Sequence, residues 1–302
     1  MNAPTDPTAQ IGLTTTGEAC HEQILRFDEG GRLVGMLRAP VEPPAPEVPA
    51  LILMNAGIIH RIGPRRLNVK LARALDPLPS LRVDLSGLGD SGTGTPGLDY
   101  QSQTFHDLKR SIEALFQALG ERPVIVIGLC SGADNAYRLA VDEPRIAGMV
   151  ALDPFSYPAP GPAFGERAKR VLDADRWRAR LNRMAGGGVA DPGAIPDYEA
   201  LERGEQNISR PVPPLSEFGT DLAALTGRGA ELFLLYTNYV KHDLATAEHF
   251  HSVFRDFEFH GRLRVAVHGD VDHTFTELAA QALLIGAIRD WLRERWGLDL
   301  PS

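Results

Sequence analysis

Cysteine is scarce in this sequence of 302 residues, which contains only Cys20 and Cys130. Two thiols in so long a chain argue against a disulfide framework and favour a reducing, cytoplasmic compartment. No apolar run approaches the roughly 18 residues that a membrane-spanning helix needs. The first segment, MNAPTDPTAQIGLTTTGEAC, also lacks the basic region followed by an apolar region that marks a secretory signal. We therefore predict a cytoplasmic protein with no membrane partner.

Basic residues are also in the minority, with 31 Lys and Arg against 39 Asp and Glu and a formal net charge of −8. A surface that binds nucleic acid normally needs a basic face, so no nucleic-acid partner is expected. The metal-binding patterns HExxH and CxxC are missing, and no metal site is predicted. The stretch GLGDSG at 87–92 matches a dinucleotide pattern, but the TGTPGLDY that follows it cannot begin the required helix. We predict no cofactor.

The order of apolar patterns along the chain indicates the fold class. A hairpin at 23–39 comes first, and short apolar runs then alternate with helical patterns, which predicts a mostly parallel sheet covered by helices on both faces. The runs expected to be strands are 50–55, 81–86, 123–128, 147–153, 231–237 and 263–269, and the helical patterns are 64–75, 105–119, 133–141, 245–257 and 276–296.

One segment interrupts this alternation and suggests an insertion. Between the sixth strand and residue 225, Pro and Gly clusters surround a single helical stretch, GERAKRVLDADRWRARLNRM. We predict a flexible tail over 1–18, a core over 19–154 and 226–302, and a mainly helical cap over 155–225. The cap also carries aromatic residues that suggest a partly apolar pocket, although ordinary packing explains them equally well: Phe155, Tyr157, Phe164, Trp177 and Tyr198.

The stretch VIVIGLCSGADNA at 124–136 reads as a strand, a sharp turn and a helix. Such a turn needs small residues two positions before and two positions after its apex, because the backbone approaches itself there. Gly128 and Gly132 put the apex at Cys130, whereas Ser131 at the apex would have no glycine on either side. A thiol at a helix N-terminus lies at the positive end of the helix dipole, which lowers its pKa from about 8.5. Cys130 is therefore a candidate nucleophile; the alternative is a buried, inert thiol.

This G-x-Cys-x-G turn resembles the nucleophile elbow of the α/β-hydrolase superfamily, and the resemblance extends over nearly the whole chain. In order, it comprises the hairpin, NAGIIHRIG after the third strand, RVDLSGLGDSG after the fourth, the elbow after the fifth, the insertion after the sixth, and DHTF after the last. The cysteine elbow is similar to those of dienelactone hydrolases and polyhydroxyalkanoate synthases. NAGIIHRIGPRR looks like hydrolases of bacterial exopolysaccharide and biosynthetic clusters. The resemblance implies an α/β-hydrolase fold with no cofactor.

The resemblance also implies partners for the thiol. His273, in GDVDHTF after the last strand, is where the superfamily carries its catalytic histidine. Such a base needs a carboxylate that orients it, and two aspartates satisfy the chain order nucleophile, acid, histidine. Asp243 follows the strand 231–237 and is the favoured acid. Asp153, after the preceding strand, is the alternative, at a position that some lipases use.

An oxyanion hole requires two donors aimed at the carbonyl oxygen of the substrate. The backbone N–H of Ser131 is expected to supply one, and the N–H of Gly57 or Ile58, after the third strand, the other. His60 and Arg61 in the same loop are candidates for contact with substrate.

These residues predict a cysteine-dependent hydrolase that acts on an ester, thioester or lactone through an S-acyl-enzyme. Its expected partner is a small acyl substrate, either free or carried as a thioester. The same site suits an acyltransferase or cyclase if the acceptor is not water. A third interpretation keeps the fold for binding alone, with a buried, unreactive thiol.

Overall fold

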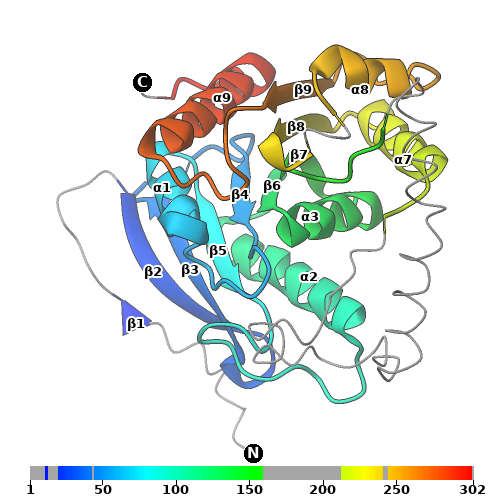
Figure 1. Cartoon of the computed structure of the whole chain (residues 1–302). Helices are drawn as coiled ribbons and strands as arrows, with labels where there is room; N and C mark the ends of the chain where they lie inside the picture. The colour runs from blue at the N-terminus through cyan, green and yellow to red at the C-terminus, as the bar shows by residue number, and fades with distance from the viewer. Residues whose placement is uncertain (1–10, 13–19, 43, 159–211, 241–243, 301–302) are drawn as a thin grey trace, which may run out of the picture.

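The computed structural model describes residues 11–12, 20–42, 44–158, 212–240 and 244–300 (Figure 1). Its strands form one sheet in the order β1-β2-β3-β5-β4-β6-β7-β8-β9. The strands are β1 (Ile11–Gly12), β2 (Cys20–Phe27), β3 (Leu33–Pro40), β4 (Ala50–Leu53), β5 (Ser80–Asp84), β6 (Val124–Leu129), β7 (Ile146–Leu152), β8 (Glu231–Thr237) and β9 (Leu263–His268). The helices are η1 (Glu29–Gly31), η2 (Pro64–Arg66), α1 (Leu67–Ala74), α2 (Tyr100–Leu119), α3 (Ser131–Asp142), α7 (Leu215–Gly227), η3 (Asn238–Val240), α8 (Ala247–Val253) and α9 (Leu278–Trp296).

The sheet is antiparallel at one edge and parallel across the rest. β1, β2, β3 and β5 pair antiparallel in succession, whereas all the pairs from β5–β4 to β8–β9 are parallel. The registers bring the ends of β6 and β7 level, because Leu129 lies opposite Leu152, and Leu152 lies opposite Leu235, two residues before the end of β8. The residues that follow these strands are therefore neighbours at the carboxyl ends of the strands, which is where ligand sites in open α/β sheets usually lie. The predicted mostly parallel sheet is confirmed.

Helices cover both faces of the sheet and enclose two apolar cores (Figure 1). One core joins the sheet to α2, α3, α7 and α8, and the other joins it to α1 and α9. β4, β6, β7 and β8 lie between the two layers, and nearly all their residues are buried. Continuous apolar runs therefore mark these strands, since both of their faces need apolar side chains.

Two predicted boundaries differ from the structure. Ile11 and Gly12, placed in the flexible tail, form β1 and pair with Ile24 and Gln23 of β2. The core resumes with α7, which begins at Leu215, before the predicted boundary at residue 226.

Helix α7 belongs to the core because of the face that it buries. Phe218, Leu222 and Leu225, spaced by four and three residues, are buried in the core that also holds α3. Phe155, counted in the cap, packs edge-on against Phe218. The preceding RPVPP stretch hid this amphipathic helix from the sequence pattern. The central part of the predicted cap, with Phe164, Trp177 and Tyr198, lies outside the described residues.

Among the described residues, no helix is both long enough and apolar enough to cross a membrane. Cys20 is buried at the start of β2, and Cys130 directly follows β6; within the described residues neither forms a disulfide.

Candidate active site

Cys130 occupies a tight turn between β6 and α3. Its backbone has φ 58° and ψ −121°, a conformation that L-residues adopt at a cost of about 1–3 kcal/mol and that concentrates at functional sites. Its N–H donates to the carbonyl of Leu152 at 3.0 Å, which ties the turn to the end of β7. A Cβ on Gly128 would lie 2.0 Å from the carbonyl oxygen of Gly132, and one on Gly132 would lie 2.4 Å from that of Asn55. Both glycines are therefore required sterically, as the sequence predicts.

The carboxylate bonded to His273 is that of Asp153. Asp153 directly follows β7, is fully buried and has φ 49°. Its Oδ2 lies 2.6 Å from Nδ1 of His273 and accepts the hydroxyl of Thr237 at 2.6 Å, while its Oδ1 accepts the Thr237 N–H at 2.6 Å. Three hydrogen bonds therefore fix the position and orientation of this buried carboxylate.

Sequence reasoning ranked the two candidate acids in the opposite order. Asp243, the favoured acid, lies outside the described residues, and Nδ1 of His273 is already bonded to Asp153. The strand registers are the physical reason: they place Asp153 beside the end of β8, where Thr237 holds it. Chain order alone does not reveal that register.

His273 sits between this carboxylate and the thiol. Burial lowers the pKa of His273, but hydrogen bonds to Asp153 and to Cys130, together with their negative charges, raise it to about 9. Because Nδ1 faces Asp153, Nε2 is the nitrogen left for Cys130. The imidazole side chain is 22% exposed, so it remains reachable from solvent.

Tyr239, in the short helix η3 after β8, covers one face of this imidazole. The two rings stack with their centroids 4.2 Å apart and their planes at 28°. The Tyr239 N–H donates to Oγ1 of Thr237 at 3.3 Å, which links η3 to the Asp153 network. The sequence analysis missed both Thr237 and Tyr239. Their position at the carboxyl end of a buried strand could have indicated them, because site residues of such sheets lie there.

The loop after β4 reaches the same edge and meets the start of α3. Ser131 is the first residue of α3, so its backbone N–H has no partner within the helix. The N–H of Gly57 donates to Oγ of Ser131 at 2.7 Å. Of the two N–H groups predicted as the second oxyanion donor, that of Gly57 is thus already bonded to a side chain. Ile58 follows it and is half-buried against the core.

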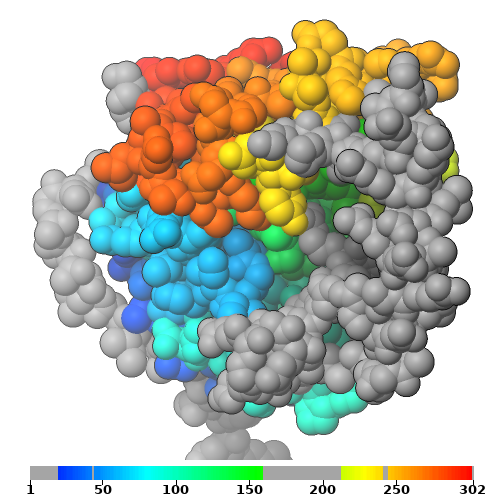
Figure 2. All heavy atoms as spheres, viewed as in Figure 1, coloured from blue at the N-terminus to red at the C-terminus, as the bar shows by residue number. Residues whose placement is uncertain are grey.

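The four segments that carry these groups lie together on one face of the molecule. In Figure 2 the loop after β4 is blue, the start of α3 green, η3 yellow and the loop before α9 orange, and they meet near the centre of the view. The segments that carry the cysteine elbow, the histidine and the serine N–H therefore meet on one face, with the aspartate buried beneath the histidine.

Comparison with known proteins identifies the family. The family model described as "Alpha/beta hydrolase family" matches residues 59–292, most of the chain. The chain belongs to the α/β-hydrolase family. Comparison of the sequence with curated proteins finds no match.

Solved structures of two esterases and one α/β serine hydrolase share this fold at low sequence identity. An esterase from Pyrococcus furiosus is 15% identical with a TM-score of 0.55, over 98% of this chain and 95% of its own. A cold-adapted esterase from an Arctic intertidal metagenomic library is 13% identical with a TM-score of 0.53, over 95% and 99%. A serine hydrolase without a lid from Xanthomonas campestris is 15% identical with a TM-score of 0.52, over 93% and 96%.

Arg61 of this hydrolase forms hydrogen bonds and ion pairs with two aspartates, one the last residue of β5 and the other in the segment after it. Its N–H donates to Oδ1 of Asp84 at 2.6 Å, and its guanidinium pairs with Asp84 and, at 2.7 Å, with Asp90. These bonds give Arg61 a structural role, and its contact with substrate stays a prediction. His60, the other candidate, is exposed in the same loop. A Cβ on Gly89 would lie 2.1 Å from the carboxylate of Asp84, so this glycine of the GLGDSG stretch leaves the space that the Asp84 side chain occupies.

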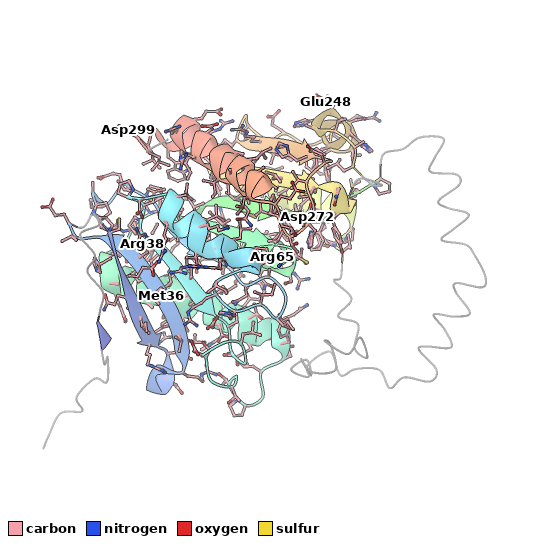
Figure 3. All side chains as sticks on the ribbon, turned by 60° about the vertical axis from the view of Figure 1, so that its left-hand side comes forward. Met36, Arg38, Arg65, Glu248, Asp272 and Asp299 are labelled. Carbon is pink, nitrogen blue, oxygen red and sulfur yellow. The ribbon has the colours of Figure 1, made fainter. Side chains whose placement is uncertain are left out.

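The loop that carries His273 is braced by Asp272, which is labelled in Figure 3. Its carboxylate accepts the N–H groups of Thr274 and Thr276 at 3.1 and 2.8 Å, and their hydroxyls at 2.9 and 3.0 Å. These bonds shape the loop between β9 and α9. In the part of the chain that the structure describes, no cluster of three His, Cys, Asp or Glu residues is arranged to hold a metal ion.

Proposed function

We propose that this α/β-hydrolase cleaves carboxylic esters, thioesters or lactones through an S-acyl intermediate on Cys130. The observation that carries the proposal is the hydrogen-bonded series from Cys130 through His273 to the buried Asp153. A thiol next to an oriented histidine is the arrangement that activates a cysteine nucleophile. Asp153 is the proposed acid of this triad in place of Asp243.

Acylation begins from a thiolate–imidazolium pair, in which Nε2 of His273 already holds the thiol proton. The thiolate of Cys130 attacks the substrate carbonyl. As the sulfur–carbon bond forms, negative charge develops on the carbonyl oxygen, which the backbone N–H of Ser131 stabilises. The tetrahedral intermediate then collapses, the bond to the leaving oxygen or sulfur breaks, and the imidazolium returns its proton to that atom. The acyl group is left on Cys130.

Deacylation repeats these steps with water. Nε2 of His273 accepts a proton from water, the resulting hydroxide attacks the thioester, and the thiolate of Cys130 leaves as the carboxylic acid forms. Asp153 remains ionised throughout, because it serves to hold the Nδ1–H tautomer and to stabilise the imidazolium. An amine or thiol in the place of water would give acyl transfer by the same sequence of bonds.

Intact-mass spectrometry after rapid mixing with activated esters and acyl thioesters tests the proposal. The parent protein should gain the mass of one acyl group, Cys130→Ala should gain none, and circular dichroism should show the same fold for both. Turnover by Cys130→Ala at the parent rate would overturn the assignment. Product analysis with and without an added amine or thiol distinguishes the free acid from a transferred acyl group.

Alkylation by iodoacetamide distinguishes the proposal from a binding protein that only keeps the fold. Cys130 should react rapidly near pH 7, where an ordinary thiol with a pKa of about 8.5 is mostly protonated. Cys20, only 4% exposed, is the control within the same chain and should react slowly. Equal, slow reaction of the two thiols would favour the unreactive interpretation.

A further inference from the structure

The side chain of Ser131 follows the nucleophile directly, and within the described part of the chain its hydroxyl uses only one of its three hydrogen-bonding positions. A serine hydroxyl can accept two hydrogen bonds and donate one. Its Oγ accepts the Gly57 N–H at 2.7 Å, so that nitrogen fills one acceptor position. Among the hydrogen bonds of the described residues, none uses the hydroxyl proton of Ser131 as donor. This proton is therefore available to a group that enters the site.

We infer that the hydroxyl of Ser131 donates a hydrogen bond to the substrate oxyanion, next to the backbone N–H of the same residue. The inference rests on the proposed function, because an oxyanion develops only if Cys130 attacks a carbonyl. No proton is transferred in this step: the sulfur–carbon bond forms, the carbonyl electron pair moves to oxygen, and the Ser131 O–H bond stays intact. One residue then supplies two donors.

The bond from Gly57 makes the hydroxyl a better donor. An O–H group whose oxygen accepts a hydrogen bond is polarised, so its proton forms a stronger bond to the next acceptor. The same bond restricts the rotation of the hydroxyl group about its Cβ–Oγ bond. A donor held in place before the reaction needs no reorganisation when charge develops, which is the main advantage of an oxyanion hole.

The loop geometry favours the hydroxyl over the Gly57 N–H as the second donor. The amide of Asn55 donates to the carbonyl of Ile59 at 3.0 Å, and the Ile59 N–H donates to Ala56 at 3.0 Å. These bonds close a turn around Gly57, whose φ is 55°. Turning the Gly57 N–H toward substrate would require this turn to change and would leave Ser131 without its present partner.

The rate of Cys130 acylation in Ser131→Ala and Ser131→Thr, measured in a single turnover with an activated ester, tests the inference. Iodoacetamide alkylation of Cys130 is the matched control, because displacement of iodide at a saturated carbon develops no oxyanion. Ser131→Ala should slow acylation by about 100-fold, the lower end of the cost of losing one such donor, and leave alkylation unchanged. Ser131→Thr, which keeps a hydroxyl, should recover most of the acylation rate.

Three results would overturn the inference. Acylation of Ser131→Ala as fast as that of the parent would show that the N–H of Gly57 or Ile58, or no second donor, serves the oxyanion. Equal slowing of acylation and alkylation would assign Ser131 to the reactivity of the thiol. A slow Ser131→Thr variant whose alkylation and thermal unfolding match the parent would exclude the hydroxyl as the active feature. If the parent alkylates normally but forms no acyl adduct, the proposed function fails, and the inference fails with it.

Discussion

Replacing Asp153 by asparagine would change the proton position on His273 while nearly keeping the shape of the side chain. An amide nitrogen at the Oδ1 position would face the Thr237 N–H, donor against donor, so the amide should turn its NH₂ toward the Oδ2 position. There it faces Nδ1 of His273, which must then give up its proton and accept. The proton moves to Nε2, the nitrogen that faces Cys130, and the imidazole can no longer take the thiol proton.

The expected loss follows from this change of tautomer. In a serine triad the corresponding substitution lowers kcat by about 10⁴, which corresponds to about 5.4 kcal/mol of transition-state stabilisation. The free energy of unfolding should fall by much less, on the order of 1–3 kcal/mol, since one buried acceptor is lost but the carboxamide fills the same space. Asp153→Asn should therefore be folded and nearly inactive.

Steady-state kinetics of Asp153→Asn and Asp243→Asn, at matched protein concentration and with unfolding curves for both, measure this difference. Asp243→Asn is the matched control and should keep most of the activity, because Asp153 already occupies Nδ1 of His273. The reasoning would be refuted if Asp153→Asn retained a substantial part of the parent rate, or if the two variants lost activity equally.

The same variant should change the pH dependence of stability. The pKa of His273 is raised from 6.5 to about 9 in the folded protein, so its contribution to stability is fully present below about pH 6.5. That contribution is lost as the pH rises through about 9. Asp153→Asn removes one cause of the raised pKa of His273, so the free energy of unfolding should fall less steeply with pH in this variant. Urea unfolding at several pH values between 6 and 10 measures it, and parallel curves for parent and variant would contradict the assignment.

Two further substitutions test the elbow and the ring above the histidine. Gly132→Ala should cost about 1–3 kcal/mol of stability and much of the activity, because its Cβ would lie 2.4 Å from the Asn55 carbonyl oxygen. Gly286→Ala, in helix α9, is the control, because no neighbouring atom lies within 4 Å of the added Cβ, and it should stabilise the protein by about 0.5–1 kcal/mol. Urea unfolding measures both variants, and a change of the same sign in the two would contradict the steric argument. Tyr239→Leu should lower the pKa of His273 in an NMR titration, whereas a phenylalanine there should preserve it, since an aromatic face favours the imidazolium. An unchanged pKa in the leucine variant would show that the stack has no electrostatic effect.

Much of the fold was predictable because it depends on local patterns. Apolar runs mark strands buried on both faces, and helical periodicity marks the covering layers, so the order of elements indicates a parallel sheet. The elbow was predictable for a steric reason that acts within five residues, from Gly128 to Gly132. The site of His273 followed from its place after the last strand, although its partner did not.

The remaining features depend on which strands are neighbours and on how the loops cross the sheet edge. Asp153 follows β7 and His273 follows β9, and the two meet because β7, β8 and β9 are consecutive in the sheet, an order that a sequence does not display. The bond from Gly57 to Ser131 joins residues that are 74 positions apart. The stack of Tyr239 depends on the path of η3. In each case the determining contact is long-range, whereas periodicity and turn chemistry describe only neighbours in sequence.

The anchoring of Asp153 separates the site into parts of unequal local stability. Asp153 follows β7, accepts two hydrogen bonds from the last residue of β8 and donates its own N–H to Leu235, so it is attached to two central strands. The loop of His273 is held near the surface by Asp272 and its two threonines, and its buried residues Val271 and Phe275 attach it to the core beside α9. Local opening follows the weakest attachments first, and the free energy of such opening can be far below that of global unfolding. Loss of activity and loss of the sheet are therefore separate events: on gentle heating the histidine can leave the thiol while the nine strands remain paired.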